Sequence, residues 1–190
     1  MAGSMADSVG WRGNRFRIAV WAAAGLLVLL PFVVMPFTDE VDWDLADFVV
    51  FGTMLVVAGL IFELLVRKAR NDTYRTAVGV AVAAAFFLVW MTLAVGIIGN
   101  ENDDANLMVG GVLAVGVIGA LIARFRPSGM ARAMFTTALA QVLVALAALI
   151  AGWGTTSSNW PRDILGATAV FVALWLISAM LFRGAALEGS

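Results

Sequence analysis

The sequence predicts an all-α integral membrane protein, a six-transmembrane-helix bundle in three antiparallel hairpins. Hydrophobic residues make up 62% of the 190 residues and the mean hydropathy is +0.95, whereas a soluble domain is about half apolar. Charged residues make up only 13% and gather in short clusters. Between these clusters lie six apolar runs, each close to the roughly 20 residues needed to span the hydrocarbon core of a bilayer.

Each apolar run is expected to be a helix, because backbone groups in lipid must pair within their own segment. The predicted spans are 16–37, 48–66, 77–98, 107–123, 134–153 and 164–182. No small-residue cleavage site follows the first run, so we expect it to be a signal anchor. One transmembrane domain, 16–184, is predicted between cytoplasmic tails at 1–15 and 185–190. The opening MAGSMADS and the closing GS have the composition of residues added by cloning and do not enter the fold prediction.

The charged residues predict the orientation. Eleven of the twelve basic residues fall on one side of the predicted spans, namely Arg12, Arg15, Arg17, Arg67, Lys68, Arg70, Arg75, Arg124, Arg126, Arg132 and Arg183. The other side carries most of the carboxylates, with Arg162 as its basic residue. Because Lys and Arg in short loops favour the cytoplasmic side, the pattern predicts cytoplasmic termini.

A spacing of 20 residues separates an Asp from an Arg around three of the spans, in the pairs Asp47 and Arg67, Asp104 and Arg124, and Asp163 and Arg183. One interpretation is three duplicated hairpins, as in many transporters. The alternative is that membrane thickness and the charge preferences of helix ends impose the spacing on any span. The sequence leaves both interpretations open.

The fourth span, 107–123, contains Gly110, Gly111, Gly116 and Gly119 and no aromatic residue. Small residues let helices approach closely in lipid. We therefore expect this helix to be the packed centre of the bundle.

Polar residues inside the spans are the candidate ligand-binding residues. Gln141 lies near the predicted midplane, one helical turn from Thr137, and an unpaired amide is costly in hydrocarbon. Glu63 lies inside the second span, one turn from Arg67. These groups either contact a ligand or serve structure, through interhelical hydrogen bonds for Gln141 and an ion pair for Glu63.

Trp90 and Trp175 lie inside spans, with Phe86 and Phe87 close to Trp90. They would line an aromatic pocket for a lipid, quinone or pigment. The alternative is that they are lipid-facing or packed bulk.

The acidic loops TDEVDWD and NENDDAN offer carboxylates for a hard cation such as calcium. The candidate ligands are Asp42, Asp44, Glu101, Asp103 and Asp104. Their spacing does not match an EF-hand loop. The alternative is that these carboxylates only orient the chain and cap helices.

The composition excludes several chemistries. The chain has no Cys and no His, so we expect neither haem nor zinc, whose usual ligands these are. No nucleotide-binding, zincin or GxSxG motif is present, which argues against an enzyme. The lipid bilayer is the expected partner, with further membrane proteins or copies of the chain as additional ones, and no nucleic acid is expected.

The stretch AVGIIGNENDDANLMVGG, followed by ARFRPSGMARAMF, resembles an uncharacterised family of small polytopic bacterial inner-membrane proteins. The resemblance covers the second to fifth spans. It implies a bacterial inner-membrane location and no particular activity.

Three functions are compatible with these features. The favoured hypothesis is a small-molecule, lipid or ion binding or transport protein, and the alternative is an accessory or structural subunit of a larger membrane complex. A third hypothesis is an enzyme acting on lipid headgroups at the outer face through the acidic cluster and a metal ion.

Overall fold

Helices make up all the regular structure in the described part of the chain. The computed structural model describes residues 21–22, 25–37, 43–67, 69, 71–99, 104–155, 157 and 159–188. The elements are η1 (Met35–Phe37), α2 (Leu45–Val66), α3 (Asp72–Ala94), η2 (Asp104–Asn106), α4 (Leu107–Ile122), α5 (Pro127–Ala151) and α6 (Arg162–Glu188).

Five of these helical segments are long and apolar enough to cross a membrane: α2, α3, α4 extended by η2, α5 and α6. This fits an integral membrane protein. The first predicted span, 16–37, overlaps a shorter apolar helix, Gly25–Phe37, and residues 16–20, 23 and 24 lie outside the described residues. The count of six spans therefore stays a prediction.

The helices extend beyond several of the predicted boundaries. α3 begins at Asp72 rather than at residue 77, because the Asn71 side chain accepts a hydrogen bond from Tyr74 N at 2.9 Å and caps the helix. α5 begins at Pro127 rather than at residue 134, since proline is well tolerated in the first helical turn. It ends at Ala151 and is followed by the C-cap Gly152, whose φ of +69° is a conformation that favours glycine.

The chain forms two units, residues 1–60 and residues 61–190, and α2 contributes to both. In the first unit the N-terminal apolar helix runs antiparallel to α2. The rings of Phe32 and Phe48 lie 6.5 Å apart, and a Cβ placed at Gly59 would lie 3.1 Å from the Trp21 ring. The Trp43 ring lies 5.3 Å from both Phe48 and Phe51.

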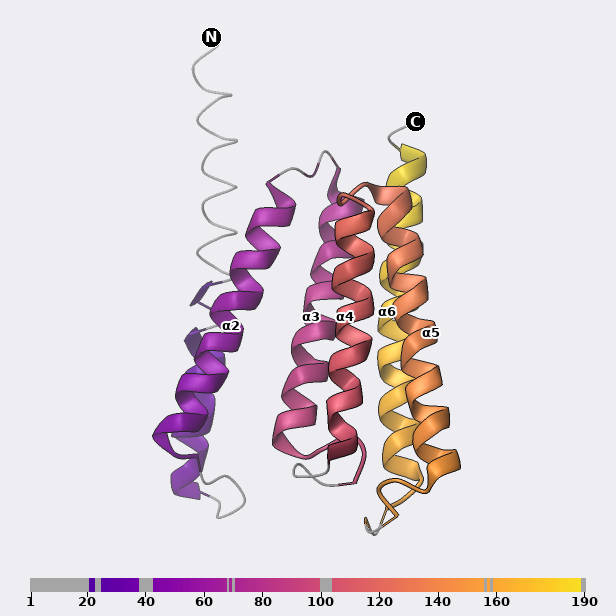
Figure 1. The fold of residues 1–190 in the computed structure, drawn as a ribbon. Helices are drawn as coiled ribbons and strands as arrows, with labels where there is room; N and C mark the ends of the chain where they lie inside the picture. The colour runs from indigo at the N-terminus through magenta and orange to yellow at the C-terminus, as the bar shows by residue number, and fades with distance from the viewer. Residues whose placement is uncertain are drawn as a thin grey trace. The chain divides into compact units, whose positions relative to one another are not determined.

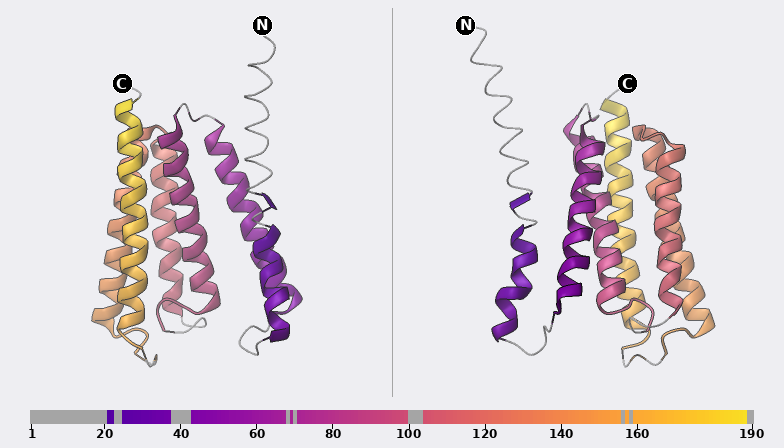
Figure 2. Two further views of the ribbon diagram at one scale, coloured as in Figure 1. Left: turned by 180° about the vertical axis from the view of Figure 1, so that it is seen from behind. Right: turned by 60° about the vertical axis from the view of Figure 1, so that its left-hand side comes forward.

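The second unit contains the bundle of α3, α4, α5 and α6 (Figure 1). α5 packs most extensively against α6 and next against α4, α6 also packs against α3, and α3 touches α4 only slightly. Two further views show the four helices lying side by side (Figure 2). The strongest contact of α3 is thus with α6, and the pairing of successive helices into three hairpins stays a prediction.

The core of the bundle lies along α5 and α6. The buried residues of α5 recur every three or four positions and so form one face: Met130, Ala133, Met134, Thr137, Ala138, Gln141, Ala145 and Ala148. The buried face of α6 is similar and holds larger side chains: Ile164, Phe171, Trp175, Ser178, Ala179, Phe182 and Ala185. The buried face of α5 thus includes four alanines, and that of α6 includes three aromatic residues.

The expectation that the glycine-rich fourth span is the packed centre is wrong. Only Val109 and Val112 of α4 are buried, and a Cβ placed at Gly110 or Gly111 would meet nothing within 4 Å. The other two glycines face α5, where a Cβ at Gly116 would lie 3.1 Å from Thr137 Oγ1. The glycines of α4 thus provide one tight contact with α5.

The tightest point of this contact yields a prediction. A Cβ at Gly119 would lie 2.9 Å from Ala133 Cβ, so Gly119→Ala must push α4 away from α5. We expect a loss of unfolding free energy of about 1–3 kcal/mol, typical of overpacking. Unfolding of the detergent-solubilised protein, followed by circular dichroism, measures the loss.

Gly110→Ala is the matched control, because its methyl group enters open space. It should be neutral or stabilising by up to about 1 kcal/mol, since alanine favours the helix. Equal stability of the two variants would contradict the close approach of α4 and α5.

Candidate functional site

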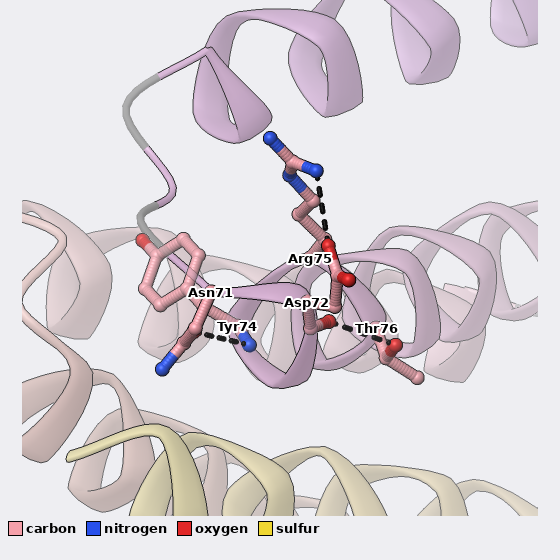
Figure 3. A network of polar contacts seen from close by, with 5 residues as sticks. All are labelled: Asn71, Asp72, Tyr74, Arg75 and Thr76. Atoms are coloured by element: carbon pink, nitrogen blue, oxygen red, sulfur yellow. Dashed lines mark hydrogen bonds and ion pairs between the residues drawn. The ribbon is translucent and has the colours of Figure 1, made fainter. Parts of the chain in front are cut away.

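Polar contacts organise the end of the bundle at which α3 begins (Figure 3). The Asp72 carboxylate pairs with the Arg75 guanidinium at 3.0 Å, and Thr76 Oγ1 donates to the Asp72 backbone carbonyl at 3.0 Å. These contacts are exposed, and such pairs contribute little to stability. They belong to the first turn of α3 and do not form a site.

Other hydrogen bonds join this end of α3 to distant parts of the chain. Asn71 Nδ2 donates to Ala185 O at 3.2 Å, near the end of α6. The Tyr74 hydroxyl donates to Phe125 O at 2.8 Å, in the turn between α4 and α5. Phe125 has a φ of +59°, an unusual value for a residue with a side chain. Both bonds bring the arginine-bearing helix ends together at one end of the bundle.

Glu63 is engaged in an ion pair. Its Oε1 lies 2.9 Å from Arg67 Nη2, one turn further along the chain. The carboxylate is therefore neutralised near the end of α2. This geometry matches the structural interpretation of Glu63.

Gln141 and Thr137, the two polar residues predicted within the fifth span, lie one turn apart on the buried face of α5. Thr137 is fully buried, and its Oγ1 donates to Ala133 O at 2.9 Å. Gln141 is 2% exposed, and its Oε1 has no hydrogen-bond partner in the described part of the chain. A buried acceptor without a donor is costly, so Gln141 is the strongest candidate for contact with a ligand.

A second unpaired polar atom lies on α6. Trp175 is 3% exposed, and its indole Nε1 finds no acceptor among the described residues. Gln141 and Trp175 both lie near the middle of their helices, and α5 and α6 pack extensively. The described residues therefore hold an unpaired acceptor on α5 and an unpaired donor on α6, besides the unpaired Trp160 Nε1 and Thr168 Oγ1.

The sequence predicts Trp175 only as an aromatic residue within a span. Its spacing could have placed it on the buried face of α6, because it lies four residues after Phe171 and three before Ser178. Ser178 is satisfied, because its Oγ donates to Ala77 O of α3 at 2.9 Å.

Trp90 lies toward the far end of α3 from Tyr74 and is half-buried. Phe86 and Phe87 form an edge-to-face pair with ring centroids 5.4 Å apart, and Phe87 is exposed. Trp90 is on α3, whereas Gln141 and Thr137 are on α5, and α3 and α5 make no extensive contact. The structure thus joins Gln141 with Thr137 but does not join them with Trp90 or Glu63.

The predicted cation ligands are only partly within the described residues. Asp42, Glu101 and Asp103 lie outside them. Asp44 Oδ1 accepts from Asp47 N at 2.9 Å, and Asp47 Oδ2 accepts from Asp44 N at 3.0 Å. This reciprocal arrangement is a capping box at the start of α2. Asp104 is exposed in η2, and no group of three His, Cys, Asp or Glu side chains in the described residues is placed to share a metal ion.

Asn106 has a structural role in the loop between α3 and α4. It is 7% exposed, and its Oδ1 accepts hydrogen bonds from Ile97 N and Ile98 N, both at 3.0 Å. Its Nδ2 donates to Ile98 O at 3.3 Å. Because the amide is used within the loop, it is not free to bind a cation.

No protein-family model, curated protein or solved structure matches this chain.

Asn106 gives a prediction about the loop. Asn106→Ala leaves two buried N–H groups without an acceptor, so we expect a loss of about 2–4 kcal/mol in unfolding free energy. Asn106→Asp keeps an acceptor for both N–H groups and should lose clearly less. Unfolding in detergent measures both variants, and equal losses would contradict the role of Asn106 Oδ1.

Proposed function

We propose that the chain is an integral protein of a bacterial inner membrane that binds a small molecule inside the α3–α6 bundle. The observation that carries the proposal is the unpaired Oε1 of the buried Gln141. A bound molecule with a donor group would satisfy this acceptor. Binding inside a bundle of apolar helices suits a transport or storage role for such a molecule.

The ligand that fits is small and uncharged and carries both an acceptor and a donor. The acceptor would pair with Trp175 Nε1 and the donor with Gln141 Oε1. In the described residues the buried polar side chains are Asn106, Thr137, Gln141 and Ser178, none of which is ionisable. An ion at this depth would find no countercharge and would be strongly destabilised.

The alternative, an accessory subunit of a larger membrane complex, is favoured by one feature of α4. Gly110 and Ala114 are exposed and lie one turn apart on a face that α5 does not cover. Small residues four apart let a second helix approach closely in lipid. This face would receive a helix of the partner protein.

The proposed topology has both termini in the cytoplasm. It is supported by the position of the arginines, since Arg75, Arg124, Arg126 and Arg183 lie at the bundle end joined by the Asn71 and Tyr74 hydrogen bonds. Basic residues favour the cytoplasmic face.

The topology is open to direct measurement, because the chain has no native Cys. Single-Cys variants at two exposed sites, Leu187→Cys near the arginine-bearing end and Asn159→Cys between α5 and α6, report opposite faces. In intact spheroplasts, an impermeant maleimide should label Asn159→Cys and spare Leu187→Cys. The reverse pattern would contradict cytoplasmic termini.

The ligand hypothesis is tested first by native mass spectrometry, which measures the mass of the protein released from its own membrane in mild detergent. We expect a stoichiometric small mass on the monomer. Gln141→Leu and Trp175→Phe should each reduce its occupancy by about tenfold, since each loses one buried hydrogen bond. Ser178→Ala, which removes a bond between α6 and α3, is the control and should keep the ligand.

Two outcomes would contradict the hypothesis. If the folded Gln141→Leu variant keeps the full bound mass, Gln141 does not hold the ligand. If the monomer carries no small mass and a second polypeptide co-purifies at a fixed ratio, the accessory-subunit function is the correct one.

A further inference from the structure

A cleft of about 460 Å³ lies between the end of α4 and the beginning of α5. Small residues of the two helices form its floor. A Cβ at Gly119 would lie 2.9 Å from Ala133 Cβ, and a Cβ at Gly129 would lie 2.6 Å from Ala123 Cβ. Because these positions carry at most a methyl group, the backbones meet closely and leave an open hollow above them.

The polar wall of the cleft is positively charged. Arg126, Ser128 and Arg132 line it, and its described lining contains no carboxylate. The ion pairs within the described residues are Glu63 with Arg67 and Asp72 with Arg75, so neither cleft arginine is neutralised by them. Arg132 Nε makes only a long contact of 3.5 Å with Ser128 O of its own helix. Both guanidinium groups therefore keep donors available for an anion.

Arginine is suited to phosphate, because its planar group donates two parallel hydrogen bonds to phosphate oxygens. A hydroxyl from Ser128 adds a further donor. The polar wall thus matches a phosphate group.

The wall of the cleft formed by α4 is apolar. Gly119, Ile122 and Ala123 line it, and Ile122 is 78% exposed. Other exposed apolar side chains lie nearby on the same two helices, among them Leu121, Phe135 and Leu139. Both helices are long and apolar enough to cross a membrane. A soluble phosphate would leave this apolar wall without a partner, whereas an acyl chain would cover it.

We infer that this cleft binds an anionic phospholipid, with its phosphate at Arg126 and Arg132 and an acyl chain along the surface of α4 and α5. The inference goes beyond the proposed ligand of the bundle interior and does not depend on it. The cleft involves the outer surface of two helices, whereas Gln141 is buried. The bound lipid would hold α4 against α5 at their inner ends.

The test uses the full chain, delipidated in a neutral detergent and titrated with lipid under native mass spectrometry. The probes are palmitoyl-oleoyl phosphatidylglycerol, palmitoyl-oleoyl phosphatidylcholine and inorganic phosphate. We expect one phosphatidylglycerol molecule to bind tightly. Phosphatidylcholine, which has the same acyl chains and no net charge, should bind clearly more weakly. Inorganic phosphate should bind more weakly still.

The variants are Arg126→Gln, Arg132→Gln and their combination. Each should lower the affinity for phosphatidylglycerol by about fivefold, as expected for the loss of one arginine near an anionic headgroup. Arg183→Gln is the matched control. This arginine is exposed on α6 and does not line the cleft, so its loss should change the affinity less than twofold.

A variant that keeps every charge distinguishes binding of the acyl chain from binding of the phosphate headgroup. Thr136 lines the cleft one helical turn beyond Arg132 and is exposed, so Thr136→Leu fills the hollow without disturbing the core. This variant should weaken the binding of phosphatidylglycerol and leave the binding of inorganic phosphate unchanged. Circular dichroism melting shows that each variant is folded.

Three results would overturn the inference. If Arg183→Gln weakens binding as much as Arg126→Gln or Arg132→Gln, the attraction is spread over the whole basic end. Equal binding of phosphatidylglycerol and phosphatidylcholine would remove the anion preference. Binding of inorganic phosphate as tight as that of phosphatidylglycerol would show that the ligand is a soluble phosphate.

Discussion

Close packing of helix backbones is the constraint on which the bundle depends. Lipid chains are as apolar as leucine, so apolar burial does not drive one membrane helix onto another, and van der Waals contact and interhelical hydrogen bonds must do so. The buried face of α5 contributes Ala133, Ala138, Ala145 and Ala148 to this packing. Gly119 and Ala133 bring α4 and α5 into contact, and the Phe182 ring of α6 packs edge-to-face against Tyr74 of α3, with ring centroids 5.2 Å apart. Where small residues meet at the surface, the same packing creates the α4–α5 cleft.

Hydrogen bonds at the two ends fix how the packed helices are arranged. At the arginine-bearing end, Asn71 and Tyr74 connect α3 to α6 and to the α4–α5 turn. At the other end, Asn106 satisfies two backbone N–H groups of the α3–α4 loop. The loop between α5 and α6 meets this loop closely, since a Cβ at Gly154 would lie 2.5 Å from Gly99 N. These contacts join segments distant in sequence.

Hydropathy alone located the spans at 48–66, 77–98, 107–123, 134–153 and 164–182, because residues in lipid must be apolar over a fixed length. It misplaced helix ends, since Asn71 and Pro127 extend α3 and α5 by local chemistry. It also misjudged α4, because glycine content does not show which face meets a partner. Gln141 was foreseen as a buried amide, whereas the unpaired Trp175 N–H and the Arg126–Arg132 cleft depend on packing between helices that the chain order does not reveal.

The buried polar groups of the bundle differ in whether they have a hydrogen-bond partner. Thr137 and Ser178 are buried and paired, one to its own helix and one to α3, and so they hold structure. Gln141 Oε1 and Trp175 Nε1 are equally buried and have no partner among the described residues. Apolar residues of similar size would avoid the cost of burying these unpaired atoms. The presence of both polar residues therefore favours a bound molecule that hydrogen-bonds to them. Water would suffice for either atom alone, but an acceptor and a donor on two packed helices favour one molecule that carries both complementary groups.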